Sequence, residues 1–353
     1  MQFQTHTSID DIPIGAASWK DLAGRAGAAE VFLSRAWIRA WWNNFGDGFR
    51  LYFITAEEGG EVIAFAPLML DRRRRVRFIG DGSADYVDFA VATDEAGVTH
   101  GFLDFLHDNR SIWKSGLFRN VPEASSLGRS LLRPDDSQLV LWKSLTIDAP
   151  SLLIRGHEES ARAMLAKYSL RRSETRLRRK GKLEYRVFRS ASEAKDQWPR
   201  FFEQHRLRSR DARRKSAFSD ARYRRFVQDL FESDTDSSLT HFSGLFLNEH
   251  PVAYHFGLVS DNRLLWYKPS FDPGFAEDSP GLALIRNLIE FALTNDFDEL
   301  DFTIGAEAFK QRFCNVTRRV HSIRAYHSRV RRALHYAYAA SRRFGGRILR
   351  RHQ

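Results

Sequence analysis

One short segment of the chain, residues 278–284, reads DSPGLAL and combines a helix start with the features of an anion site. Ser279 is of the type that caps helices, and Pro280 suits the first helical position. Gly281 has no Cβ, so a ligand can approach the backbone closely. The first N–H groups of a helix are unpaired and its dipole is positive there, so such a start binds anions such as pyrophosphate. The predicted anion-binding residues are Ser279, Gly281, Leu282 and Ala283.

An ordinary capped core helix accounts for the same segment. The apolar residues that follow are spaced to bury one helical face against a sheet. Glu277 and Asp278 would also repel a phosphate group unless their side chains point away. The sequence therefore leaves both interpretations open. The apolar residues in question are Ile285, Leu288, Ile289 and Ala292.

Residue types for covalent or metal chemistry are scarce in this chain. Cys314 is the single cysteine, which excludes a disulfide framework within the chain and fits a reducing compartment. The twelve histidines form no HExxH motif, and no CxxC, Walker or Rossmann glycine pattern occurs. We therefore predict no metal, and we interpret Cys314, which lies beside Phe313, as structural.

The elements that would position the DSPGLAL segment follow a regular order in the second half of the chain. The pattern predicts a strand, two helices, three antiparallel strands, a helix, a strand, a short helix and a last strand. The basic stretch 158–182 before them is predicted to be helical. The predicted strands are 184–189, 239–247, 252–259, 263–268, 298–303 and 320–326, and the helices are 192–209, 221–232, 281–294 and 306–313.

The first half repeats part of this order, helices and then three adjacent strands, which indicates a diverged tandem of one fold. Ser34 is predicted to cap a helix that carries Trp37 and Trp41 on one face. Residues 122–150 have a less regular pattern, with a boundary predicted near 148–151. The predicted strands are 51–56, 62–70, 76–79, 86–91 and 117–121, with a helix at 98–107 and a basic run at 72–75.

The length of 353 residues predicts two domains, and the positive charge is concentrated at one end. Residues 318–353 contain eleven arginines and no acidic residue, whereas the remaining basic and acidic residues balance at 44 each. This distribution argues against a basic core that binds nucleic acid. The tail has the pattern of a basic amphipathic helix, which suits an anionic membrane surface, although a helix packed on the body fits as well.

Neither a membrane-spanning run of about 18 apolar residues nor a secretory signal pattern is present. We therefore expect a cytoplasmic protein, with peripheral attachment at the inner face of the cytoplasmic membrane as the alternative.

Five strings, in this order along the chain, resemble the motifs of one family. They are APL at 66–68, DYVD at 85–88, FFEQHRLR at 201–208, FD followed by SPG within 271–281, and DF with GAEAFK within 301–310. Together they resemble the CelD/BcsL-type family of GNAT acyltransferases, which is related to the Fem aminoacyltransferases, over roughly residues 30–325. Phe309 stands where that family usually has tyrosine, so a role for that hydroxyl is absent here.

The resemblance implies an α/β (α+β) fold of tandem GNAT-like domains, each a mixed, mostly antiparallel sheet flanked by helices. It also implies that the second half keeps the acyl-CoA site. The expected divisions are an N-terminal GNAT-like domain at 1–150, a basic helical connector at 151–182, a C-terminal GNAT domain at 183–327, and an Arg-rich tail at 328–353.

The resemblance further implies acyl transfer from acyl-CoA, as co-substrate, to an amine or hydroxyl, with a general base and no covalent nucleophile. Glu307 is the first candidate base because it follows the strand where the acceptor should approach. His205, which would titrate near neutrality, Asp301 and Asp272 are the other candidates. Lys310 would bind a phosphate of the acceptor or of CoA, or form an ion pair. The expected substrate-binding residues are Asp85, Tyr86 and Asp88, in a cleft between the halves, with Arg208, Asp272 and Lys310; for the first three, hydrogen bonds that hold a loop are the alternative.

The expected acceptor is a small-molecule or lipid-linked precursor of the cell envelope. It would be an amino sugar or exopolysaccharide intermediate, or an amino lipid such as a long-chain base. Two other functions stay open. The basic residues within 171–182 suit a Fem-like aminoacyl transfer from charged tRNA, the one reading with a nucleic-acid partner. Phe309 and the acidic pair before Ser279 also suit a scaffold that has lost turnover and docks to a polysaccharide synthase.

Overall fold

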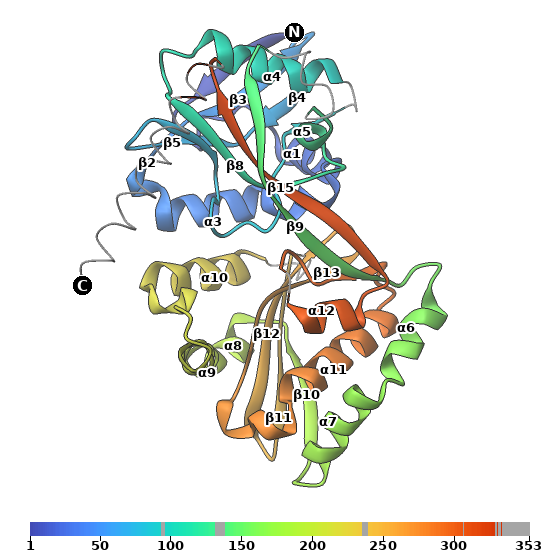
Figure 1. Cartoon of the computed structure of the whole chain (residues 1–353). Coiled ribbons are helices and arrows are strands. Elements are labelled where there is room, and N and C mark those ends of the chain that lie inside the picture. The colour runs from blue at the N-terminus through green and yellow to red at the C-terminus, as the bar shows by residue number, and fades with distance from the viewer. Residues whose placement is uncertain are drawn as a thin grey trace, which may run out of the picture. The chain divides into compact units, whose positions relative to one another are not determined.

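A computed structural model of the chain describes residues 1–92, 96–130, 138–234, 239–305, 307–328, 330 and 333. These residues form two units, which Figure 1 shows in one view. Unit 1 comprises residues 1–26, 47–146 and 321–353, and unit 2 comprises residues 27–46 and 147–320. The chain passes from one unit to the other within strand β9 (Val140–Leu153) and returns within strand β15 (Val316–Tyr326).

The sheet of unit 2 runs in the order β10-β11-β12-β13-β14-β9. All pairs are antiparallel except β13 with β14, which are parallel and join Arg263–Leu265 to Glu299–Asp301. Residues 266–271 extend β13 beyond this pairing, so the two strands part there. The strands are β10 (Leu183–Phe188), β11 (Thr240–Leu247), β12 (His250–Ser260), β13 (Arg263–Phe271) and β14 (Glu299–Asp301).

Helices cover both faces of this sheet (Figure 1). On one face, α11 (Pro280–Thr294) packs with α6 (Glu158–Leu165) and α7 (Tyr168–Arg178) in an aliphatic core. On the other face, α9 (Gln197–Asp211) and α10 (Ala221–Ser233) contribute aromatic rings, and Trp198 stacks on Phe242 at 4.2 Å between ring centroids. The smaller helices are α8 (Ala191–Ala194), η4 (Ala217–Ser219), η5 (Pro273–Asp278) and α12 (Ala308–Phe313).

The N-terminal residues 27–46 belong to unit 2, although the sequence predicted them within a 1–150 domain. They form η1 (Gly27–Ala29), α2 (Glu30–Leu33) and α3 (Arg35–Phe45), and Ser34 caps α3 as predicted. The physical reason is aromatic packing, because Trp37 meets Phe226 edge-to-face at 5.6 Å.

Unit 1 contains two sheets, in the orders β1-β3-β4-β7 and β2-β5-β6-β8-β15-β9. Helices α1 (Ala16–Gly24), α4 (Ala96–Asp108) and α5 (Ser126–Ser130) and the turn η2 (Gly46–Gly48) complete it. The strands are β1 (Gln2–His6), β2 (Phe49–Leu51), β3 (Phe53–Glu58), β4 (Glu61–Ala66), β5 (Leu68–Asp71), β6 (Arg75–Phe78), β7 (Ala90–Val91) and β8 (Ser115–Pro122).

The fold class is the one that the sequence predicted, a tandem of mixed, mostly antiparallel sheets flanked by helices. Several boundaries were wrong. The expected boundary at 148–151 lies inside β9, which has no alternating pattern because its first half is largely exposed. The connector 151–182 is part of the unit 2 core, since Leu170 and Leu177 are fully buried there. The predicted strand 86–91 is reduced to β7, and the helices 158–182 and 192–209 are each broken in two.

None of the helices among the described residues combines the length and apolar character that crossing a bilayer requires. The predicted amphipathic tail, residues 328–353, lies almost entirely outside the described residues, so its attachment to a membrane stays a prediction.

Candidate functional site

A pocket of about 250 Å³ opens in unit 2 where the half of β13 that lies beyond its pairing with β14 meets the start of α11. The predicted residues Ser279, Gly281 and Leu282 line it. Helix α9 contributes Arg208, and α12 contributes Phe309. Its other walls are formed by Trp266, Pro269, Ser270, Phe271, Ala276, Pro280, Leu284 and Ile285. The DSPGLAL segment therefore combines the two readings left open by the sequence, because it begins a core helix and also lines a pocket.

The start of α11 differs in detail from the prediction. Pro280 occupies the first helical position as expected, but Ser279 has left-handed backbone angles (φ 59°, ψ 52°) and its side chain makes no capping bond. Its carbonyl accepts the N–H groups of Leu282 at 2.9 Å and, more weakly, Ala283 at 3.4 Å. The sequence predicted free N–H groups at this helix start, whereas both of these already donate to the carbonyl of Ser279. Ala283 is also fully buried and is not among the residues that line the pocket.

Gly281 has room for a side chain. A Cβ atom added there would lie 3.5 Å from Cδ1 of Phe271, an ordinary van der Waals contact, and the backbone angle φ is not in the left-handed region. Packing within the protein therefore does not require glycine at this position. The open space belongs to the pocket.

Basic residues of α7 and of the turn that follows it contact the two acidic residues before Ser279, and they pair the carboxylate of one of them, Asp278. Lys180 forms an ion pair with Asp278, which is only 6% exposed, and Arg176 donates a hydrogen bond to the carbonyl of Glu277 at 2.8 Å. The predicted repulsion of an anion by Asp278 is therefore reduced, since its charge is paired. The same contacts bring cationic side chains of α7 next to the start of α11.

Arg208 is held in the pocket wall by two contacts. Its Nη1 donates to the carbonyl of Pro269 at 2.9 Å, and its guanidinium lies over the ring of Phe271 at 4.8 Å. Burial lowers the pKa of Arg208 from its ordinary value, and the nearby Arg214 lowers it further. The remaining N–H donors of this fork suit a phosphate or carboxylate group.

The loop after β14 carries Glu307, Lys310 and Gly305 in close contact. Nζ of Lys310 lies 3.1 Å from Oε2 of Glu307 and donates to the carbonyl of Ile304 at 2.8 Å. Lys310 is 4% exposed and forms an ion pair with Glu307, which was one of the two alternatives, so phosphate binding by this residue stays a prediction. Gly305 has φ +138°, and a Cβ atom there would lie 2.2 Å from Oε2 of Glu307, so this close approach requires glycine.

Glu307 is ionised and half-exposed. Burial opposes its ionisation, but the ammonium group of Lys310 and the helix-start N–H outweigh this effect and hold the pKa of Glu307 below its ordinary value. Two residues further along the chain, Phe309 packs edge-on to Trp266 at 6.3 Å in the pocket wall. Glu307 itself does not line the pocket, but its charge acts on Arg208 in the pocket wall and opposes the lowering of the pKa of that arginine.

The other predicted bases have structural roles. Asp301 is 1% exposed and accepts the N–H of Thr303 at 2.7 Å, so it holds the loop after β14. Asp272 caps η5 by accepting the N–H of Gly274 at 2.9 Å, and its other oxygen lies 2.7 Å from Nε2 of His250. Both carboxylates are therefore engaged in hydrogen bonds that hold loops next to the pocket.

His205 does not titrate near neutrality as predicted. Burial, reinforced by the positive charges of Lys268 and Arg208, lowers its pKa to about 4. Its Nδ1 lies 2.8 Å from Oγ of Ser216, which orients the ring. His205 is therefore neutral at pH 7, and the choice of Glu307 as the candidate base rests on its negative charge and on its neighbour Phe309 in the pocket wall, not on a higher pKa, since the pKa of Glu307 is also lowered.

The buried histidines of unit 2 predict an acid-sensitive fold. Burial also lowers the pKa of His241, to about 3. Because the folded-state pKa of both rings lies below the ordinary value of about 6.5, the unfolded chain binds more protons between pH 6.5 and the folded pKa. The free energy of unfolding should therefore fall as the pH drops from 6.5 towards 4, by up to about 1.4 kcal/mol per pH unit for each histidine. Denaturant titrations at pH 7, 6 and 5 measure this slope, and His205→Asn should flatten it; an equal slope in both proteins would contradict the assignment.

Three further predicted residues lie in unit 1. Asp88 is 1% exposed and accepts the N–H groups of Ser126 at 2.8 Å and Leu127 at 2.9 Å, so it anchors the start of α5. Burial raises the pKa of Asp88 to about 6, against the lowering effect of these hydrogen bonds. This carboxylate has the loop-holding role that was the alternative to substrate binding. Asp85 and Tyr86 stay predictions as acceptor contacts.

We expect Asp88→Ala to destabilise unit 1 without affecting ligand binding in unit 2. Loss of both acceptors leaves two backbone N–H groups without their partner, which should lower the free energy of unfolding by about 1–3 kcal/mol. Asp88→Asn, which keeps one acceptor oxygen, should lose less. Urea unfolding monitored by fluorescence measures both, and an unchanged midpoint for the alanine variant would contradict the anchoring role.

Sequence analysis missed Trp266, Pro269 and Phe271 as pocket residues. The predicted strand ended at Lys268 because proline usually breaks a strand pattern, whereas β13 continues through Pro269 to Phe271 beyond its pairing with β14. The side chain of Trp266 stacks on the fully buried ring of His255 at 5.1 Å and forms the inner wall. The aromatic residues Trp266, Tyr267 and Phe271 close to this proline were the available signal.

Among the described residues, side chains of His, Cys, Asp and Glu do not converge in groups of three or more that would hold a metal ion. Cys314 is partly exposed and lies 3.6 Å from the carbonyl oxygen of Gln311, at the end of α12. The site described above therefore consists of backbone groups, one arginine, one carboxylate and aromatic walls.

Comparison with known proteins agrees with this fold. Residues 165–311 match the family model described as acetyltransferase (GNAT) domain. FemX superposes with a TM-score of 0.64 at 10% identity, covering 92% of this chain and 97% of FemX. The C-terminal domain (DUF2156) of an Agrobacterium fabrum protein assigned as a lysylphosphatidylglycerol synthetase gives 0.57 at 15% identity, covering 91% and 94%.

A tandem GNAT protein from the clavulanic acid biosynthesis pathway is also similar, with a TM-score of 0.51 at 12% identity, covering 91% of this chain and 97% of that one. At these identities the similarity concerns the fold alone. A comparison with curated proteins found no match. The chain thus has a tandem GNAT fold, and its second unit contains the segment that matches the acetyltransferase family.

Proposed function

We propose that the protein is an acyltransferase that takes its acyl group from acyl-CoA and binds this donor in unit 2. The observation that carries the proposal is the pocket formed by the start of α11 and the half of β13 beyond its pairing with β14, within the segment that matches the acetyltransferase (GNAT) family. A helix start, an arginine and an apolar channel are the groups that a pyrophosphate with a long amide arm needs.

The pyrophosphate would lie at the start of α11, against the Gly281 backbone. The N–H of Ala283, which makes only a 3.4 Å bond to Ser279, would be redirected to it. Arg208 and the cationic residues of α7 would supply further positive charge. The pantetheine arm would follow β13 from Phe271 to Trp266, five residues that span about 16 Å in an extended strand. The thioester would then lie near Trp266 and Phe309.

In this arrangement Glu307 would act as the general base. Its lowered pKa keeps it ionised at neutral pH, so it can remove the proton from an acceptor ammonium or hydroxyl group, directly or through a water molecule. A backbone N–H on the free edge of β13 would polarise the thioester carbonyl during attack. The acceptor nitrogen or oxygen forms the new bond to the acyl carbon, the carbon–sulfur bond breaks, and CoA leaves as a thiolate that takes up a proton.

The acceptor we propose is a precursor of the cell envelope, either an amino sugar or exopolysaccharide intermediate or an amino lipid. The five motifs that resemble the CelD/BcsL-type family support this class, and the Arg-rich tail supports a cytoplasmic protein that reaches its acceptor at an anionic membrane surface. A Fem-like transfer from charged tRNA is the second candidate, which the fold similarity to FemX supports.

The proposal is tested by measuring the release of free CoA thiol. The protein is incubated with acetyl-CoA and a panel of amino sugars, amino lipids and hydroxyl analogues. We expect release that depends on both acceptor and Glu307. Transfer that proceeds with aminoacyl-tRNA, and with no acyl-CoA at all, would replace it with the Fem-like function.

A further inference from the structure

A second, larger hollow lies in unit 1 and shares no lining residue with the proposed donor site. It measures about 500 Å³ and is formed where η2 and the edge strand β2 meet the turn between β5 and β6. This turn contains the basic run 72–75, to which the proposed acyl transfer assigns no role. The residues of its wall that matter here are Phe49, Arg50, Leu70, Arg72, Arg74 and Ile112.

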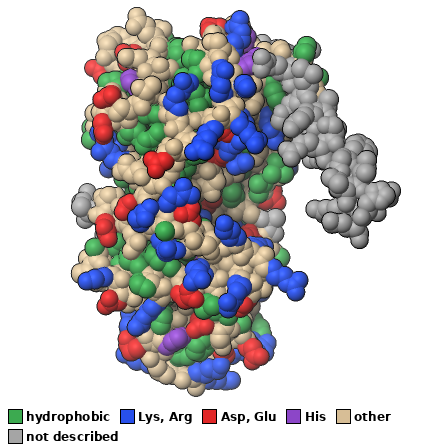
Figure 2. Space-filling view, turned by 90° about the vertical axis from the view of Figure 1, so that its left-hand side faces the viewer, with side chains coloured by type: hydrophobic (Ala, Val, Ile, Leu, Met, Phe, Trp, Pro, Cys, Tyr) green, Lys and Arg blue, Asp and Glu red, His purple; other side chains and the backbone are tan. Residues whose placement is uncertain are grey.

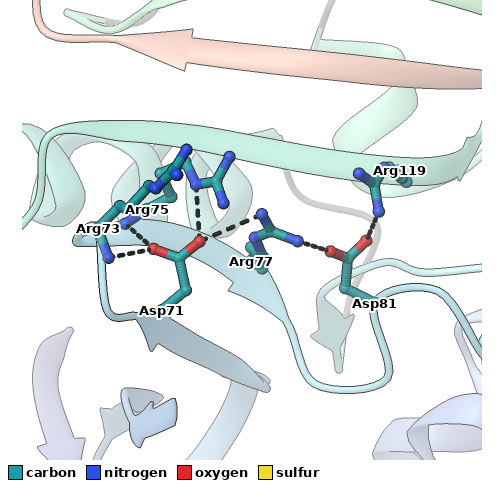
Figure 3. Close-up of polar contacts among 6 residues, drawn as sticks. All are labelled: Asp71, Arg73, Arg75, Arg77, Asp81 and Arg119. Atoms are coloured by element: carbon teal, nitrogen blue, oxygen red, sulfur yellow. Dashed lines mark hydrogen bonds and ion pairs between the residues drawn. The ribbon is translucent and has the colours of Figure 1, made fainter. Parts of the chain in front are cut away.

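Two carboxylates, Asp71 and Asp81, bind the neighbouring arginines, as Figure 3 shows. Asp71 accepts the backbone N–H groups of Arg73 and Arg75 at 2.9 and 3.0 Å, and it also binds the guanidinium groups of Arg75 at 2.6 Å and Arg77 at 3.2 Å. Asp81 binds Arg77 on its other side and Arg119 at 2.9 Å. The acidic charge of both aspartates is therefore already shared among arginines.

Three arginines line the hollow, and among the described residues most of their N–H donors make no hydrogen bond within the protein. Nε of Arg74 donates to the carbonyl of Ile112 at 2.8 Å, and one of its terminal nitrogens donates to the carbonyl of Ser111. These two backbone carbonyls orient the guanidinium group without neutralising its charge. Arg50 and Arg72 are exposed, and among the described residues neither guanidinium has a hydrogen bond or ion pair within the protein. A guanidinium group has five N–H donors, so most of this donor capacity faces the solvent-filled hollow.

The lining of the hollow carries a net positive charge. The lining contains the arginines at 50, 72 and 74 and the aspartates at 47 and 71, an excess of one positive charge, and the carboxylate of Asp71 is already paired with Arg75 and Arg77 from outside the lining. In Figure 2, Lys and Arg side chains also gather over part of the surface of unit 1. Phe49, Leu70 and Ile112 give the same hollow an apolar wall. An anion with an apolar portion matches both properties.

We propose that this hollow binds a phosphate group carried by an amphiphilic ligand, with Arg50, Arg72 and Arg74 as its donors. Arginine recognises phosphate through paired N–H groups, and these charge-assisted hydrogen bonds are the strong ones. The bounded volume and apolar wall favour one headgroup-sized anion over an extended polyanion such as RNA. The phosphate could belong to a soluble ester or to a membrane lipid, and both share this chemistry.

Binding of inorganic pyrophosphate, measured by calorimetry at low salt, tests the proposal. The full chain should carry Gly281→Asp throughout, so that the proposed donor site does not contribute. We expect Arg50→Gln/Arg72→Gln to weaken binding about tenfold or more. Arg129→Gln, an exposed arginine of unit 1 outside the hollow, is the matched control and should leave binding unchanged. Equal thermal unfolding of the three proteins without ligand establishes that they are folded.

A second arm identifies the source of the phosphate. The protein is sedimented with phosphatidylglycerol vesicles. If it sediments with them, and if this is lost in the double variant and inhibited by pyrophosphate, the phosphate belongs to a lipid headgroup. Pyrophosphate binding without such sedimentation indicates a soluble ester. The proposal would be overturned if the double variant and the control bound pyrophosphate with the same affinity, or if neither bound it. It would also be overturned if RNA bound through Arg50 and Arg72 and pyrophosphate did not inhibit this binding.

Discussion

Glu307→Gln is expected to lower kcat for acyl transfer by about 10²- to 10⁴-fold, the usual contribution of a positioned general base. The KM for the acyl-CoA donor should change little, because Glu307 is not among the residues that line the proposed donor pocket. Glutamine keeps the size of the side chain and removes only its ability to take up a proton. Steady-state kinetics with an accepted amine measures both parameters.

The matched control is Glu290→Gln, which changes an exposed carboxylate on α11 outside the pocket and should leave kcat unaltered. The wild-type rate should also rise with pH as the acceptor ammonium loses its proton to an ionised Glu307, whose lowered pKa keeps it available below neutrality. If kcat fell less than threefold in Glu307→Gln, this carboxylate would not be the base.

Gly281→Asp is expected to weaken acyl-CoA binding by about 10- to 100-fold, since it places a negative charge next to the proposed pyrophosphate position. Space is not the reason, because a Cβ atom at Gly281 meets only Cδ1 of Phe271, at 3.5 Å. Gly281→Asn therefore separates charge from size, and it should retain more affinity than the aspartate variant. Equilibrium titration with CoA gives both dissociation constants.

Equal losses in the aspartate and asparagine variants would assign the effect to bulk. Unchanged affinity in both would mean that the donor does not approach this backbone, and the pyrophosphate position would have to be abandoned. Because the side chain of residue 281 projects into the pocket, neither substitution should prevent folding, which thermal unfolding without ligand can verify.

Much of unit 2 was predictable because local pattern and tertiary packing agree there. Helix α11 has an apolar face that meets a sheet, and Pro280 stands at its first position as predicted. The prediction failed where packing overrides local pattern. Residues 27–46 lie in unit 2 because Trp37 packs on Phe226, a partner 189 positions away that no local pattern reveals.

The site was predictable in its residue types but less so in their roles. The DSPGLAL segment and Glu307 lie in or beside one pocket, whereas Asp301, Asp272 and Asp88 hold loops. A carboxylate after a strand has the same sequence signature whether it faces a substrate or accepts a backbone N–H. Burial decides between these roles, and burial depends on contacts distant in sequence, as does the lowered pKa of His205.

Thermal unfolding of the full chain with CoA, acetyl-CoA and a long-chain acyl-CoA tests the central claim most directly. A ligand that binds only the folded state adds RT ln(1 + [L]/Kd), about 2.7 kcal/mol at 100 times Kd. We expect CoA and acetyl-CoA to raise the melting temperature of the wild type, and to raise that of Gly281→Asp much less. No stabilisation by any of the three ligands would contradict an acyl-CoA donor.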